Sequence, residues 1–94
     1  KLTVLPALYS VTELETALKT ADVVVLMKVS SVYPQVWSIL QKHGLLQQSY
    51  VVERATRSDQ VIYADLRDRP DLKLHYFSLL IVQVNAPDAT FPTF

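Results

Sequence analysis

The stretch ADVVVLMKV, residues 21–29, decides how the rest of the chain folds. Val23 to Met27 is an uninterrupted apolar run of five residues, three of them valine, and Lys28 ends it. Such a run is typical of a β-strand that is covered on both faces, because β-branched side chains fit a pleated surface. It is much shorter than the roughly 20 apolar residues that cross a membrane. We therefore predict an internal strand of a sheet rather than a membrane span.

A short helix is expected before this strand. Thr12 and Glu15 form a T-x-x-E capping box, in which the hydroxyl accepts from a backbone N–H three residues on and the carboxylate reaches back. Apolar residues then recur at helical spacing along one stripe: Leu14, Ala17, Leu18 and Ala21. This pattern predicts about two turns of helix with a single buried face.

A second helix is expected after the strand. Ser30 or Ser31 can cap it, and Pro34 fits its first turn, where no N–H partner is needed. Its apolar stripe consists of Tyr33, Val36, Trp37 and Leu40. Gly44, the only glycine of the chain, stands just past the last turn, where a left-handed residue closes a helix.

The remaining segments predict four more strands and one loop. Residues 2–5 form a short apolar strand, and residues 50–55 form a longer one. Residues 61–63 follow a polar turn and can pair back as a hairpin. Residues 76–84 are a long apolar run that we expect at the centre of the sheet, whereas residues 64–75 carry most of the charge and indicate an exposed loop with room for one helical turn.

Two helices cannot cover both faces of such a sheet. We therefore predict an α/β two-layer sandwich, with a mixed four- to five-stranded sheet and the helices mainly on one face. The face without helices would be left for another domain or subunit. Residues 1–84 make up this domain, and residues 85–94 form a tail with two prolines and two phenylalanines that we expect to be ordered only where it docks.

Composition narrows the classes of function. The chain has 9 Lys plus Arg and 9 Asp plus Glu, a balance that gives no general attraction for nucleic acid or an anionic membrane. Cysteine is absent, which excludes disulfides and Cys-based zinc sites and fits a cytoplasmic protein. No signal peptide is visible, and the chain opens with Lys1 rather than methionine, so we expect a piece of a longer protein.

Motifs for catalysis and metal binding are missing from the sequence. A single glycine cannot build a phosphate-binding loop, and no serine stands in a nucleophile elbow. His43 and His75 lie far apart, so we interpret His43 as a residue favoured by a helix C-terminus and His75 as a loop residue. The alternating charges of residues 64–75 are interpreted as a solvated loop. We expect no metal site and no catalytic residue in this chain.

Two segments carry a resemblance to a known family. The first is ADVVVLMKV, with Met27 in the place of a family methionine, and the second is YVVERATRSDQVIY, residues 50–63, with the pair Ala55-Thr56 and then Gln60. Together with the closing run YFSLLIVQV, they resemble the C-terminal domain of the tetrapyrrole methylases over nearly all of residues 1–84. ERAT, MKV and YFSLLIV are most similar to the branch that methylates carbon 20 of precorrin-2 or of the cobalt-bearing cobalt-factor II.

This resemblance implies a C-methyltransferase of cobalamin biosynthesis that uses S-adenosylmethionine (SAM). In the family, SAM folds into a cleft between two α/β domains of a homodimeric enzyme, and the N-terminal domain carries the Gly-rich loop and most of the substrate trough. The present domain would supply one wall of the SAM pocket, with Met27 and Ala55 beside the adenosyl group and Leu26 and Thr56 in backbone contacts. The chain alone is expected to be inactive and to bind SAM weakly or not at all.

Each of these residues also has an ordinary structural interpretation. In the cofactor role, the Met27 thioether would pack on the flat purine, and the small Ala55 would let the backbone approach the adenine edge. Met27 can equally be a core residue, and Ala55 can mark a tight crossing of strands. Lys28 and Arg54 can bind the carboxylates of the tetrapyrrole, or they can lie exposed at a sheet edge or in ion pairs with neighbouring acids.

Two other functions are compatible with the sequence. Another branch of the same family would act on uroporphyrinogen III, on a later precorrin or on a substrate that is not a tetrapyrrole. A member of a different class would be a non-catalytic α/β module for regulation or dimerisation. A glycine-rich strand–turn–helix encoded upstream would favour the enzyme.

Overall fold

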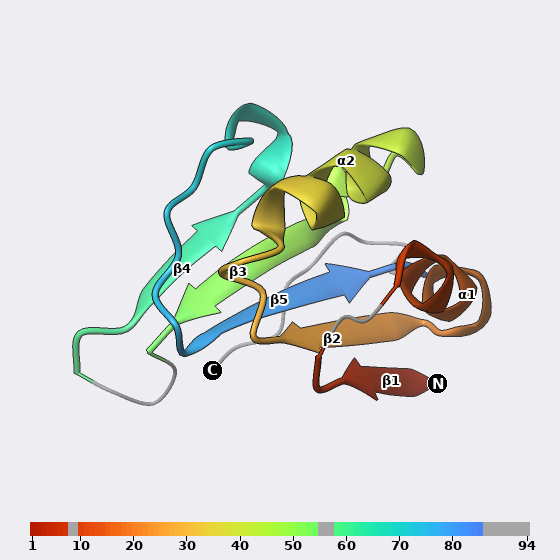
Figure 1. Ribbon diagram of the computed structural model, residues 1–94, viewed down its shortest axis with the longest axis horizontal. Helices are drawn as coiled ribbons and strands as arrows, with labels where there is room; N and C mark the ends of the chain where they lie inside the picture. Colours follow the sequence, from red (N-terminus) through yellow and green to blue (C-terminus); the bar gives the residue numbers. More distant parts are fainter. Residues whose placement is uncertain (8–9, 55–57, 86–94) are drawn as a thin grey trace.

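The structure of the protein is a computed structural model, and it describes residues 1–7, 10–54 and 58–85. Strands and helices follow one another in the order expected from the sequence (Figure 1). The elements are β1 (Leu2–Leu5), α1 (Val11–Thr20), β2 (Val23–Met27), α2 (Tyr33–Lys42), β3 (Ser49–Glu53), β4 (Val61–Ala64) and β5 (Ser78–Gln83), with short 3-10 helices at Leu46–Gln48 and Leu66–Asp68.

The five strands form one mixed, open sheet in the order β1-β2-β5-β3-β4. β1 runs parallel to β2, and β5 runs antiparallel to both β2 and β3, so the first three strands share one direction. β4 pairs back on β3 as the predicted hairpin partner, and β5 is the central strand, as predicted. The α/β class and the mixed sheet, here with five strands, are thus confirmed.

Both helices pack against the same face of the sheet (Figure 1). The connections explain why, since β1-α1-β2 and β2-α2-β3 step across the sheet in the same direction, and crossovers of one hand that step the same way place their helices on one face. The side chains between the layers form one core. Its members with no exposed surface include Leu14, Val24, Leu26, Val36, Leu40, Val51, Leu80 and Val82.

The start of α1 differs from the prediction. Its N-cap is Ser10 rather than Thr12, and the Ser10 hydroxyl oxygen accepts a hydrogen bond of 3.1 Å from the backbone N–H of Glu13. Ser10 and Glu13 repeat the same capping spacing two residues earlier, so the sequence holds two such boxes in tandem, and Thr12 falls inside the first turn. The predicted stripe is buried throughout: Leu14, Ala17, Leu18 and Ala21.

The second helix is also capped differently from the prediction. Its N-cap is Val32, which provides no side-chain hydrogen bond, so the predicted serine cap is wrong. Pro34 does stand in the first turn, as predicted, because a proline there gives up only an N–H that has no partner in the helix. Gly44 follows the last turn with φ 67°, which is the left-handed conformation that its position predicts.

The segment from Asp65 to His75 is less solvated than its charges suggest. Leu66 is fully buried in the predicted helical turn, and this segment packs against α2. The Tyr33 hydroxyl donates to the carbonyl of Arg69 at 2.7 Å, and burial raises the pKa of Tyr33 to about 12. A few leucines among the charges therefore fix the loop, although the charges themselves remain at the surface.

The opposite face of the sheet carries no helix within the described part of the chain. A smaller apolar cluster lies there, with Tyr50, Val52 and Ile81 buried. The prediction that β2 is covered on both faces is wrong at the end of the strand, because Met27 is 38% exposed. No helix in the described ranges has the length and apolar character that a membrane crossing requires.

Candidate functional site

The C-terminal ends of β2 and β3 lie at the same end of the sheet, because the two strands are parallel and both pair with β5. Met27 pairs with Leu79, and Leu79 pairs with Val52, so one row of side chains crosses three strands. Lys28 and Arg54 follow the two strands directly. We call this region the β2–β3 end; it comprises residues 27–28, 53–54 and 75–79.

The two predicted cofactor contacts on β2 lie on opposite faces of the sheet. Met27 is partly exposed on the face away from the helices, so its interpretation as a core methionine is wrong. Leu26 is fully buried in the core beneath the helices. It can therefore serve a ligand only through its backbone, which lies between β1 and β5 in the sheet.

The other two predicted cofactor contacts, Ala55 and Thr56, lie outside the described residues. Arg54 is the last described residue before them. The structure therefore places only one side of the predicted adenosyl slot.

Lys28 and Arg54 share an uncommon backbone conformation. Their φ angles are 55° and 52°, which is the left-handed region that costs a residue with a side chain about 1–2 kcal/mol. Lys28 is exposed and has no ion pair within the described ranges. Arg54 lies with its Nε 3.5 Å from Oδ2 of Asp59 and its guanidinium 4.0 Å from Oε2 of Glu53. The ion-pair interpretation thus holds for Arg54, and the exposed one holds for Lys28.

An exposed aromatic pair at this end was missed by the sequence argument. Residues 76–84 were expected to form one strand, but β5 begins at Ser78, and Tyr76 and Phe77 form a turn before it. Their side chains are 59% and 67% exposed, whereas the following strand is largely buried. The sequence carries no signal that separates this pair from the strand, because two apolar residues before a continuous apolar run are read as part of it.

The end of the sheet around Gly44 is built differently. We call residues 41–48 the Gly44 end; it lies where α2 finishes and β3 begins. His43 lies at the C-terminus of α2, as predicted, with its Nε2 2.8 Å from Oε2 of Glu15 on α1. The hydrogen bond from His43, and then the one from Lys42, lower the pKa of Glu15.

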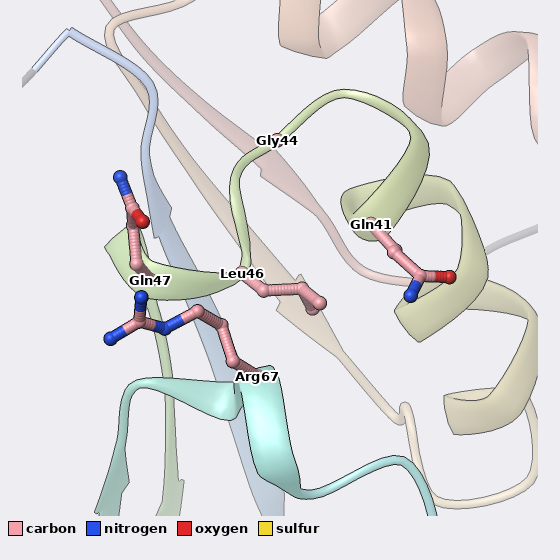
Figure 2. A pocket seen from close by; sticks show the side chains of 5 residues that line it. All are labelled: Gln41, Gly44, Leu46, Gln47 and Arg67. Atoms are coloured by element: carbon pink, nitrogen blue, oxygen red, sulfur yellow. The ribbon is translucent and has the colours of Figure 1, made fainter.

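A hollow of about 260 Å³ opens at the Gly44 end. Figure 2 shows its walls, which come from α2, the following turn and the two 3-10 helices: Gln41, Gly44, Leu46, Gln47 and Arg67. Arg67 is held by Asp65, with Nη2 2.6 Å from Oδ2, and this hydrogen bond lowers the pKa of Asp65. A second hollow of about 260 Å³ is lined by residues 68–73. Both are smaller than the roughly 300–1,000 Å³ of ordinary ligand pockets, and neither is lined by the β2–β3 end.

The described part of the chain contains no cluster of potential metal ligands. Nowhere in the described ranges do three His, Asp or Glu side chains come close enough together to hold a metal ion. His43 is engaged with Glu15, and the ring nitrogen Nδ1 of His75 accepts from the N–H of Phe77.

The β2–β3 end is suited to binding. It offers a thioether, two aromatic rings, the His75 imidazole and two cations, and its acid, Glu53, is buried beside Arg54. Apolar and aromatic side chains pack on flat rings, and cations pair with carboxylates.

No protein-family model and no curated protein sequence matches the chain.

Proposed function

We propose that this chain is the C-terminal domain of a SAM-dependent tetrapyrrole methylase that methylates carbon 20 of precorrin-2 or cobalt-factor II in cobalamin biosynthesis. The β2–β3 end forms one wall of the cleft, and the N-terminal domain of a longer, homodimeric cytoplasmic protein forms the other. The observation that carries the proposal is the position of Met27. It is exposed at the end of β2, and one intervening strand, β5, separates it from the end of β3, which precedes Ala55 in the sequence.

The residues at this end fit the purine of SAM on one side. The Met27 thioether is polarizable and accessible, so it can pack against the flat adenine ring. Ala55 and Thr56 are the proposed partners on the second strand, and Leu26 contributes backbone only. SAM supplies a methyl group that is already activated by the positive charge of its sulfonium.

The charges at this end indicate which ligand lies where. The sulfonium of SAM is a cation, which Lys28 and Arg54 repel, and the two residues attract carboxylates, of which the tetrapyrrole carries several and SAM only one. The proposed role of both residues is therefore to hold the acidic side chains of the tetrapyrrole. Lys28 is the stronger candidate, because Arg54 is already engaged with Asp59 and Glu53.

Methyl transfer from SAM to an electron-rich ring carbon depends mainly on position. The two reactants must be held in line at near-attack distance, with water kept out. A domain that binds and orients can serve this reaction without an acid–base pair of its own. The chain alone is therefore expected to transfer no methyl group.

The test is an assay of the full-length protein with precorrin-2 and SAM, in which NMR identifies the methylated carbon. Met27→Ala is expected to raise the KM for SAM several-fold, because it removes packing from one side of the purine. Leu2→Ala is the matched control, since Leu2 is an exposed apolar residue on the same face at the opposite end of the sheet.

Three results would change the proposal. Methylation of a different tetrapyrrole would move the protein to another branch of the family. A full-length protein that binds no S-adenosylhomocysteine would favour a non-catalytic regulatory or dimerisation module. An unchanged KM for SAM in Met27→Ala would remove Met27 from the binding site.

A further inference from the structure

The turn before β5 is a fixed structure. The Phe77 backbone N–H donates to Nδ1 of His75 at 3.1 Å, and the Ser78 hydroxyl donates to the carbonyl of His75. The Phe77 carbonyl accepts from the backbone N–H of Arg54 at 3.2 Å, which joins the turn to the end of β3. These bonds hold the turn from both sides, so the fold determines the backbone from which Tyr76 and Phe77 project.

The turn presents a row of three rings. Phe77 meets Tyr76 edge to face with ring centroids 5.1 Å apart, and the His75 ring lies 5.7 Å from Phe77 on a tilted plane. Tyr76 and Phe77 nevertheless remain more than half exposed. Exposing two large aromatic side chains forgoes the free energy of burying them, so a fixed turn that presents them indicates a binding surface.

The surroundings of these rings determine the kind of ligand that fits. Arg54 is bonded to the turn through its backbone, and Lys28 follows Met27, which pairs with Leu79 of β5. The rings therefore share the β2–β3 end with cations, one of which has no acidic partner in the described ranges. Rings that offer a face for stacking, with cations beside them, suit a flat molecule that carries carboxylates.

We propose that the turn of residues 75–78 is a stacking platform for a planar tetrapyrrole, with the face of Phe77 on the macrocycle, the perpendicular Tyr76 ring against it by its edge, and Lys28 on its carboxylates. This assignment rests on the proposed function for the identity of the macrocycle. It gives the two ligands separate places at the β2–β3 end, with the purine at Met27 and the macrocycle at the aromatic turn.

The probe for this platform is uroporphyrin I, a flat tetrapyrrole with carboxylates on every pyrrole ring. Titration of the probe with the chain, followed by porphyrin fluorescence, gives a Kd. Phe77→Ala and Tyr76→Ala are each expected to weaken binding about 3- to 10-fold, because each removes one aromatic contact. Lys28→Gln is expected to weaken binding and to reduce its dependence on salt, since it removes one charge.

Controls separate stacking from loss of structure. Phe77→Trp is expected to restore binding, because it keeps an aromatic face, and Leu2→Ala is expected to bind as the unmodified chain does. Unchanged affinity in Phe77→Ala would overturn the platform. Self-association of the chain that Phe77→Ala abolishes, without porphyrin binding, would also overturn it and would assign the turn to a protein interface.

The platform and the proposed function fail in different ways. If porphyrin binding depends on Phe77 but the full-length protein methylates no tetrapyrrole, the function is wrong and the platform stands. If full-length Phe77→Ala methylates precorrin-2 with an unchanged KM for the tetrapyrrole, the platform is wrong and the function stands.

Discussion

The two ends of the sheet differ in which residue types adopt the left-handed backbone conformation. At the Gly44 end, the residue with positive φ is glycine, which adopts this conformation without steric cost. At the β2–β3 end, two of the three other described residues with positive φ are Lys28 and Arg54, which both carry long cationic side chains. The same conformation is therefore relaxed at Gly44 and strained at Lys28 and Arg54. The third such residue, Asp65, adjoins the Gly44 end, where its backbone N–H donates to the carbonyl of Ser49.

This difference shows that the chain keeps long side chains at Lys28 and Arg54 at a cost in stability. Residues with side chains persist in the left-handed region only where the surrounding structure enforces it, and such positions cluster at functional sites. The β2–β3 end also exposes Phe77 and Tyr76, whereas the Gly44 end carries the clasp between Glu15 and the end of α2. We therefore expect substitutions to lower stability more at buried or relaxed positions than at the β2–β3 end.

The largest expected difference lies between two adjacent residues of β2. Leu26→Ala is expected to lower the free energy of unfolding by about 2–5 kcal/mol, because it leaves a cavity in the core beneath the helices. Met27→Ala is expected to cost less than about 1 kcal/mol, because its side chain is partly exposed and can be removed without a cavity. Urea unfolding followed by circular dichroism measures both values.

An equal loss of stability in the two variants would break the comparison. It would mean that Met27 packs as a core residue, and the exposed thioether on which the proposed function rests would be lost. The expected result leaves Met27→Ala folded, which makes it usable in binding and kinetic assays.

The next predicted effect concerns two residues with a left-handed backbone, one at each end: alanine replaces Gly44, and glycine replaces Lys28. Gly44→Ala is expected to cost about 1 kcal/mol, and a Cβ there would meet no atom within 4 Å, so the cost is conformational. Lys28→Gly is expected to leave stability unchanged or to raise it by up to about 1 kcal/mol, because relief of strain outweighs the added entropy of the unfolded chain. Thermal unfolding of the two variants gives the signs directly.

A clear loss of stability in Lys28→Gly would contradict this interpretation. It would show that the lysine side chain stabilises the fold, and its retention would then need no functional explanation. Lys28→Ala separates the two causes, since alanine keeps the strain and removes the cation.

Much of the fold could be predicted because local patterns and global topology agree. The apolar run of β2, the stripe of α1 and the glycine after α2 each specify an element through its own residues. The strand order could not be predicted in the same way, because the insertion of β5 between β2 and β3 depends on contacts between distant segments. The capping error at α1 arose because two equivalent caps, Ser10 and Thr12, lie two residues apart, whereas α2 begins at Val32 without a side-chain cap.

The candidate site was predictable only in part. The resemblance proposed Met27 for the cofactor and Lys28 and Arg54 for the substrate, and pairing with β5 places the two strand ends at one end of the sheet. It did not indicate the aromatic turn, because an apolar pair beside an apolar strand is read as part of that strand. Leu26 was chosen as a neighbour of Met27, but neighbours on a strand point to opposite faces.

The smallest predicted effect concerns the clasp at the Gly44 end. The hydrogen bonds from His43 and then Lys42 hold the pKa of Glu15 below its ordinary value of 4.5. The unfolded chain therefore takes up the Glu15 proton at a higher pH than the folded chain does. The stabilisation is fully present above about pH 4.5 and is lost as the pH falls through the lower, folded pKa. Glu15→Gln should thus lower Tm slightly at pH 7, and the difference between the two proteins should shrink as the pH falls below about 4.5.

A double-mutant cycle with His43→Gln tests whether the clasp is the cause. If Glu15 stabilises α1 against α2 through His43, the second substitution adds little to the first at pH 7, and the pH dependence of the difference disappears in the His43→Gln background except for the part that Lys42 supplies. Fully additive losses would mean that Glu15 acts elsewhere, for example on the dipole of its own helix. In that case the clasp would add nothing to the Gly44 end, where Gln48 still donates to the carbonyls of Gln83 and Val84, and the contrast between the two ends would depend on Gly44 and Lys28.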